Sequence, residues 1–232
     1  MSGGRNGAAS VSDLWAYDPT ANTWTNLNPA TSDHPSTIGF PSMAYDASAH
    51  KAIFFGSALS GMVISDTWAY DPSAKTWTRL NPAGDVPSAR VGQRLVYDPG
   101  TGKVILFGGW LDGTAFDAIW TYDYAANTWT ELHPAGDVPP GRVSHSMVYD
   151  SASGTVVLFG GLGGGGTCLD DTWAYDPVAN TWTELYPAGE KPSARSGHSM
   201  FYDSGVGKVI LFGGLEADDT YLSDTWDYGV EP

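Results

Sequence analysis

Two series of tryptophans recur along this chain of 232 residues at an almost constant interval. Members of the first series are 52 or 53 residues apart and comprise Trp15, Trp68, Trp120, Trp173 and Trp226. The second series follows nine residues behind the first and comprises Trp24, Trp77, Trp129 and Trp182. A fixed period of about 50 residues is typical of repeat architectures, in which each unit packs only against its neighbours. This period constrains the fold more than any other property of the chain.

One unit, residues 142–185, illustrates the local structure that the repeat predicts. Its four strands are expected at residues 145–150, 155–159, 171–176 and 181–185. The second of these is apolar at nearly every position, as expected of a strand that is buried on both faces. In the turn before the fourth strand, Asp176 can accept backbone N–H groups, Pro177 presets φ, and Asn180 tolerates a left-handed conformation.

The repeat predicts an all-β fold. Sustained helical periodicity is absent from the sequence, and four short antiparallel strands cannot bury both faces of their sheet alone. Stacking the units around an axis buries these faces, so we expect a β-propeller of about four four-stranded antiparallel blades. The tryptophans expected in the core between blades are Trp68, Trp77, Trp120, Trp129, Trp173, Trp182 and Trp226.

A recurring motif makes the fold more specific. It reads Arg-x-x-His-Ser, then an apolar strand closed by Gly-Gly, then Tyr-Asp with a Trp six residues after the Asp. The glycine pairs are Gly108-Gly109, Gly160-Gly161 and Gly213-Gly214. This motif resembles the kelch repeat, and the resemblance covers nearly all of the chain. Early units depart from it: Gln93 replaces the histidine in one, and Ile38, Pro41 and Ser57 replace motif residues in another.

The strand count leaves two arrangements open for the single propeller domain, residues 1–232. We expect a partial blade at 1–32, blades at 33–85, 86–137 and 138–190, and a partial blade at 191–232. The strands at 13–27 and 198–214 can close a four-bladed ring, which leaves the strand around Trp226 redundant. Alternatively the chain is an open arc or a fragment of a larger propeller. We favour the open arc, which predicts self-association or completion by further sequence.

Candidate ligand-binding residues lie in the loops between second and third strands and just before each first strand. In the kelch family this end of the propeller is the usual ligand face. Arg90, Arg142 and Arg195 occupy equivalent positions there, either as a ring of guanidinium groups for a ligand or as partners of carbonyls and carboxylates of their own blades. Trp110 and Tyr221 lie in the loops themselves, where they can stack on a ligand or cover the core.

No catalytic residue, metal site or cofactor is expected. His145 and His198 sit at equivalent positions inside the repeat motif, which favours hydrogen bonds within each blade over metal binding. The carboxylates of the variable loops lack the Asp-x-Asp-x-Asp-Gly pattern of a calcium loop. The one thiol, Cys168, has no neighbouring motif that matches the copper site of galactose-oxidase-like enzymes.

Charge and composition limit the partners. The net charge of -15 repels a phosphate backbone, so nucleic-acid binding is not expected, and the apolar runs are too short to span a bilayer. We expect a non-catalytic module that binds a protein or a glycan. A sugar-active enzyme of mutarotase or oxidase type and a structural segment of a larger secreted protein are the alternatives. The first residues do not read as a secretory signal; the resemblance favours an extracellular or periplasmic location.

Overall fold

The computed structural model describes residues 2–6, 9–27, 34–35, 42–59 and 62–229, with strands and turns but no helix in these ranges. The described ranges therefore contain no helix that could cross a membrane. Five antiparallel sheets follow one another along the chain, and we number them 1 to 5. The all-β propeller of antiparallel blades expected from the sequence is confirmed.

The strands of the five sheets are as follows. Sheet 1 contains β1 (Ser2–Asn6), β2 (Ala9–Asp18) and β3 (Thr23–Asn26). Sheet 2 contains β4 (Met43–Asp46), β5 (Lys51–Leu59), β6 (Met62–Asp71) and β7 (Thr76–Leu80). Sheet 3 contains β8 (Arg94–Asp98), β9 (Lys103–Phe107), β12 (Ile119–Asp123) and β13 (Thr128–Leu132), and a separate hairpin pairs β10 (Trp110–Leu111) with β11 (Thr114–Ala115). Sheet 4 contains β14 (Arg142–Val143), β15 (Ser146–Asp150), β16 (Thr155–Gly163), β17 (Cys168–Asp176) and β18 (Thr181–Leu185). Sheet 5 contains β19 (Ser199–Asp203), β20 (Lys208–Leu215) and β21 (Tyr221–Tyr228).

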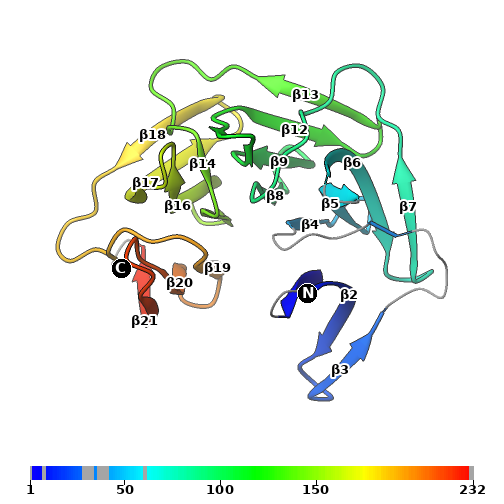
Figure 1. Ribbon diagram of the computed structural model, residues 1–232, viewed down its shortest axis with the longest axis horizontal. Helices are drawn as coiled ribbons and strands as arrows, with labels where there is room; N and C mark the ends of the chain where they lie inside the picture. The colour runs from blue at the N-terminus through cyan, green and yellow to red at the C-terminus, as the bar shows by residue number, and fades with distance from the viewer. Residues whose placement is uncertain (1, 7–8, 28–33, 36–41, 60–61, 230–232) are drawn as a thin grey trace.

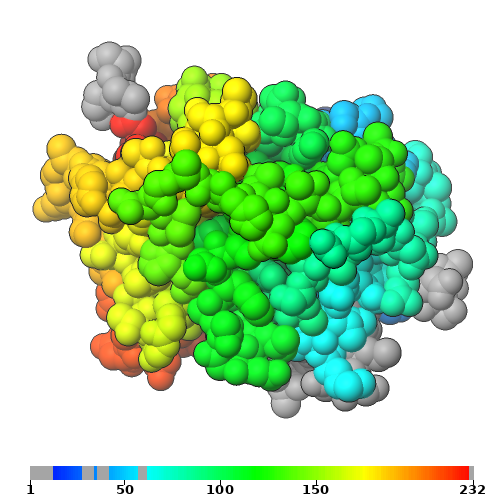
Figure 2. Space-filling model, turned by 90° about the horizontal axis from the view of Figure 1, so that it is seen from above, coloured from blue at the N-terminus to red at the C-terminus, as the bar shows by residue number. Residues whose placement is uncertain are grey.

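The sheets stand around a common axis like the blades of a propeller (Figure 1). Each sheet is a meander, in which a strand pairs with the next strand of its sheet; the exception is the short β14, which pairs with β16 and not with β15. Sheets 1 and 5 flank the opening of the arc in Figure 1. In a view toward the outer edge of the propeller, the residues of sheets 2, 3 and 4 follow one another in chain order and form one continuous surface (Figure 2).

The core lies between neighbouring sheets and contains the tryptophans of the repeat. The exposed fraction is between 4% and 9% for six of them, Trp68, Trp77, Trp120, Trp129, Trp173 and Trp182. Trp226 in sheet 5 is only half-buried. The second strands also contribute strongly to the core, since Val104, Ile105 and Leu106 are fully buried on β9.

The turn between third and fourth strands has the chemistry that the sequence predicts. Asp176 Oδ1 accepts the backbone N–H groups of Val178 and Ala179, both at 2.9 Å. Asn180 is left-handed, with a φ of 52°. Its Oδ1 also accepts a hydrogen bond from the Tyr175 hydroxyl at 2.9 Å, which ties the turn to the core.

The strand pairings match the open arc rather than the four-bladed ring. β21 continues sheet 5, with Leu211 opposite Trp226, and β20 pairs with β19 and β21. Within the described ranges, β20 has no pairing with β2, which is instead paired with β1 and β3. Apolar side chains are exposed on the terminal sheets as a result: Trp24 is 53% exposed on sheet 1, and Phe201 and Phe212 are 54% and 53% exposed on sheet 5.

Candidate functional site

One end of the propeller is formed by hairpins that extend past the second and third strands. In sheets 2, 4 and 5 the pairing shifts register at Phe55/Ser57, Phe159/Gly161 and Phe212/Gly214, and the hairpin then continues outward. In sheet 3 the hairpin β10–β11 takes this place. We call the four segments 57–65, 110–117, 162–170 and 215–223 the loop face.

At the base of the loop face, the first glycine of two of the Gly-Gly pairs is required by close packing on the next sheet. Gly108 has a φ of 72°, and a Cβ there would lie 2.7 Å from the backbone oxygen of Arg142. Gly160 has a φ of 61°, and its Cβ would lie 2.7 Å from the oxygen of Arg195. Side chains rarely adopt such a φ, and no Cβ fits at these distances. In sheets 3 and 4 the first glycine of the pair therefore lets the base of the hairpin approach the backbone of the following unit.

The motif arginines lie beneath the loop face, not on it. Arg142 is fully buried and Arg195 is 1% exposed. Arg142 donates to the oxygen of Gly160 at 3.0 Å and makes a bidentate pair with Asp171, with both contacts at 2.6 Å. Arg195 bonds in the same way to Gly213 and Asp224. Their guanidinium groups stabilise their own sheets, which is the second of the two roles considered from the sequence.

Arg90 is equally buried, at 2% exposed, but it has a different environment. It donates to the oxygen of Gly108 at 3.1 Å and lies over the Phe116 ring at 4.1 Å. Ala118 stands where Asp171 stands in the next repeat, and no carboxylate is within ion-pair distance of Arg90 among the described residues. Burial lowers the pKa of Arg90 to about 10. The predicted ring of ligand-binding guanidinium groups is therefore not formed by these three residues.

The two motif histidines are also core residues. His145 is fully buried and His198 is 2% exposed, and each ring packs edge-on against a phenylalanine of the preceding sheet. Burial, followed by repulsion from Arg94, lowers the pKa of both, to about 3 for His198. Gln93 replaces them in the preceding repeat and donates to the oxygen of Phe55 at 2.7 Å. In the described part of the chain, no three His, Cys, Asp or Glu residues are grouped so as to hold a metal.

The loop face itself exposes aromatic and apolar side chains. Trp110 is 41% exposed on β10 and Tyr221 is 86% exposed at the start of β21. Met62, which the sequence analysis did not single out, is 66% exposed on the hairpin of sheet 2. Beside Tyr221, the end of sheet 5 has a shallow hollow that is open to solvent. This hollow is lined in part by Phe212, Leu215 and Leu222.

Negative charge accompanies these apolar groups. The four loop segments contain no Lys or Arg, and their six carboxylates are Asp112, Asp117, Asp170, Glu216, Asp218 and Asp219. Asp170 pairs with Lys191, outside the loops, at 2.7 Å. Cys168 is buried, with 8% of the residue exposed; its thiol points to the oxygen of Leu215, and burial raises the pKa of the thiol. The loop face thus combines exposed apolar anchors with a surplus of carboxylates.

Comparison with known proteins agrees with this architecture. A family model of the KLHDC2/KLHL20/DRC7 Kelch-repeats domain matches residues 99–231, and one of the Attractin/LZTR1 beta-propeller matches residues 1–114. Host cell factor 2 of Homo sapiens is 32% identical over 174 residues, which cover 69% of this chain and 21% of that protein. Kelch repeat-containing protein 2 of Saccharomyces cerevisiae is 30% identical over 163 residues, which cover 66% of this chain and 18% of that protein.

The chain therefore spans about a fifth of the length of these curated relatives. Family models match both halves of the chain, and the first of them matches more than half of it. The buried arginines, the Gly-Gly hairpins and the interleaved tryptophans recur in the structure at the same interval as in the sequence. The chain belongs to the kelch-repeat β-propeller family.

Proposed function

We propose that this protein is a non-catalytic binding module whose loop face docks a basic protein surface carrying an apolar side chain. The observation that supports this proposal is the composition of the four loop segments, which contain six carboxylates and no cation. Propellers of the kelch family typically serve as protein-interaction scaffolds, which is consistent with this role.

The two features of the loop face act on different parts of association. The carboxylates attract a cationic partner over a distance and so raise the association rate. Met62, Trp110 and Tyr221 supply apolar area that a partner can cover, and interface hot spots are enriched in Trp and Tyr. A neutral sugar would use the aromatic rings but would gain nothing from the negative charge.

A peptide array with a glycan array beside it tests this proposal. We expect the protein to retain Lys- and Arg-rich peptides that carry an aromatic or aliphatic residue, with affinity that falls as salt is added. A Trp110→Ala/Tyr221→Ala variant should bind the retained peptides at least about 10-fold more weakly. Val178→Ala, which alters an exposed side chain in a turn between third and fourth strands, is the matched control and should bind normally.

Two results would contradict the proposal. One is retention of neutral glycans with no retention of basic peptides. The other is a Val178→Ala variant that weakens peptide binding as much as the double variant does. Folding of each variant is checked by its thermal unfolding midpoint.

We also propose head-to-tail self-association through the terminal sheets. In complete interfaces, the fourth-strand tryptophan contacts the second-strand phenylalanine of the preceding sheet: Trp129 lies 5.2 Å from Phe55 and Trp182 lies 5.1 Å from Phe107. Trp24 and Phe212 hold these two positions on sheets 1 and 5, and both are half exposed. A second copy can bring them together by repeating the same contact.

Sedimentation velocity tests this self-association. It should show association that depends on protein concentration and that Phe212→Ser abolishes. A protein that is monomeric at all concentrations would refute the proposed self-association.

A further inference from the structure

The three motif arginines are held by the same two backbone contacts. In each, Nη1 donates to the oxygen of the first glycine of the Gly-Gly pair of its own sheet, at 3.0 or 3.1 Å. In each, Nε donates at 3.0 Å to the backbone oxygen of the residue two positions earlier. The guanidinium group of Arg90 is therefore fixed in the same orientation as those of Arg142 and Arg195, although it has no carboxylate partner among the described residues.

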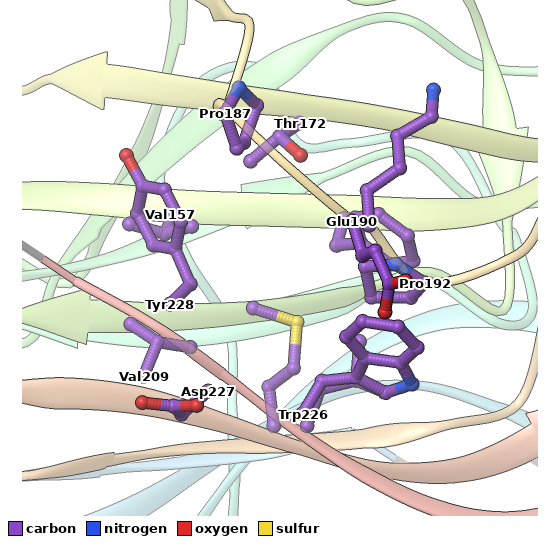
Figure 3. A pocket seen from close by; sticks show the side chains of 13 residues that line it. Val157, Thr172, Pro187, Glu190, Pro192, Val209, Trp226, Asp227 and Tyr228 are labelled. Atoms are coloured by element: carbon purple, nitrogen blue, oxygen red, sulfur yellow. The ribbon is translucent and has the colours of Figure 1, made fainter.

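In sheets 4 and 5 the motif arginine shares one carboxylate with a third-strand tryptophan. Asp171 accepts hydrogen bonds from Nη1 and Nη2 of Arg142, both at 2.6 Å, and from Nε1 of Trp173 at 2.8 Å. Asp224 accepts the same three bonds in sheet 5, and one of them comes at 2.6 Å from Nε1 of Trp226, whose indole is labelled in Figure 3. One carboxylate thus satisfies three N–H groups of two side chains.

In sheet 3 the same donors are present, but Ala118 replaces the aspartate. The indole Nε1 of Trp120 is buried and has no hydrogen-bond partner among the described residues. Arg90 has five N–H groups, of which Ser88 and a glycine oxygen accept three, one from each nitrogen. One N–H on each terminal nitrogen is left without an acceptor in the described part of the chain. These are the three N–H groups that hold Asp171 in sheet 4.

The neighbouring side chains do not supply the missing acceptor. The Phe116 ring lies 4.1 Å from Cζ of Arg90 and offers no oxygen. Glu131, opposite Trp120 on the next strand, is close enough to act on the pKa of Arg90 but forms no ion pair with it. The position borders solvent, because Ala118 is only half-buried and the Asp171 side chain is 17% exposed at the equivalent place.

We propose that Arg90 and Trp120 bind the carboxylate of a ligand in the place that the Asp171 side chain takes in sheet 4. A planar carboxylate matches the two N–H groups of the guanidinium fork, and its second oxygen can also accept the indole N–H. Binding supplies a counter-charge to a cation that burial has removed from water. The carboxylate is that of a small free acid or of an aspartate side chain on a partner. None of the donors belongs to the loop face, so this site does not depend on the function proposed above.

The test titrates the whole protein, labelled with ¹⁵N, with sodium formate and with sodium acetate against sodium chloride at equal ionic strength. We expect a saturable shift of the Trp120 indole N–H signal, assigned through a Trp120→Phe variant, and a rise in the thermal unfolding midpoint. Chloride should produce neither, because it lacks the paired oxygens that the fork requires. A Gly-Asp-Gly peptide with blocked ends distinguishes the two sources. Binding at least about 10-fold tighter than acetate assigns the site to a partner's aspartate, and equal or weaker binding assigns it to a free acid.

Two variants make the test specific to this site. Ala118→Asp places a covalent carboxylate there and should abolish the formate response, with the protein still folded. Asp171→Ala gives sheet 4 the same set of donors, so formate should stabilise this variant about twice as much as the natural protein, through two sites instead of one. Asp170→Ala removes an exposed carboxylate and is the matched control; its formate response should equal that of the natural protein.

Three results would overturn the proposal. The first is a Trp120 indole signal that does not move with formate or acetate. The second is a formate response that persists in Ala118→Asp, because the anion would then bind elsewhere. The third is an equal response to chloride, which would show an effect of salt and not recognition of a carboxylate. A saturable response to formate that Ala118→Asp removes and Asp170→Ala retains would establish the site.

Discussion

Replacing Asp171 by alanine tests the role of the buried arginines most directly. Asp171 accepts two hydrogen bonds from Arg142 at 2.6 Å and one from Trp173 Nε1 at 2.8 Å. The Arg142 side chain is fully buried and the Asp171 side chain is 17% exposed. The substitution therefore leaves a buried cation without its counter-charge and a buried indole N–H without an acceptor.

The expected cost follows from these two losses. Removing one partner of a buried ion pair costs about 3–5 kcal/mol. Arg142 keeps its bonds to the oxygens of Gly160 and Pro140, as Arg90 keeps comparable bonds where no carboxylate is present, so we expect the lower end of this range. We predict a loss of about 3 kcal/mol in the free energy of unfolding, against total stabilities of about 5–15 kcal/mol.

Urea unfolding followed by circular dichroism measures this loss. Asp170→Ala is the matched control, because Asp170 forms an exposed pair with Lys191 whose side chains are 47% and 51% exposed. Its removal should cost less than about 0.5 kcal/mol. A loss below about 1 kcal/mol for Asp171→Ala would show that Arg142 does not depend on its carboxylate, and the structural role assigned to the motif arginines would be wrong.

Three further predictions use the differences between repeats. Ala118→Asp supplies the carboxylate that sheet 3 lacks and should raise the free energy of unfolding by about 1 kcal/mol in the same urea assay; a loss would contradict this. Gly108→Ala should lower the free energy of unfolding by about 1–3 kcal/mol more than Gly84→Ala does. Both positions have a positive φ, but an added Cβ meets backbone atoms only at Gly108. Equal losses for the two variants would rule out the close-packing argument. The pKa of His198 is lowered in the folded protein, so the stability it contributes is full above its usual value near 6.5 and is lost as pH falls toward about 3. His198→Gln introduces the residue that Gln93 provides at the equivalent position, and it should reduce this loss of stability in acid by up to about 1.4 kcal/mol per pH unit. Urea unfolding at a series of pH values measures the difference. A pH profile of stability that is unchanged in the variant would exclude His198 as the source of the acid sensitivity.

Much of the fold is predictable from the sequence because it depends on local patterns that the repeat copies. Alternation of large and small residues sets the strands, and the Asp-x-x-x-Asn turn joins the third strand to the fourth wherever it occurs. The burial of Trp120 and Trp173 follows from the period alone, since no sheet of four short strands can cover its own faces. The exposure of Trp110 and Tyr221 on the loop face is less predictable, because a loop aromatic can equally well cover the core.

The role of the arginines was decided by the tertiary structure. Arg142 and Asp171 are 29 residues apart, and only the pairing of β14 and β17 with β16 brings them together. The sequence does show a repeated arginine, but whether it faces solvent or a carboxylate depends on this long-range pairing. Local patterns determine which strands form and which faces they bury, whereas the pairing of distant side chains depends on how the sheets pack around the axis.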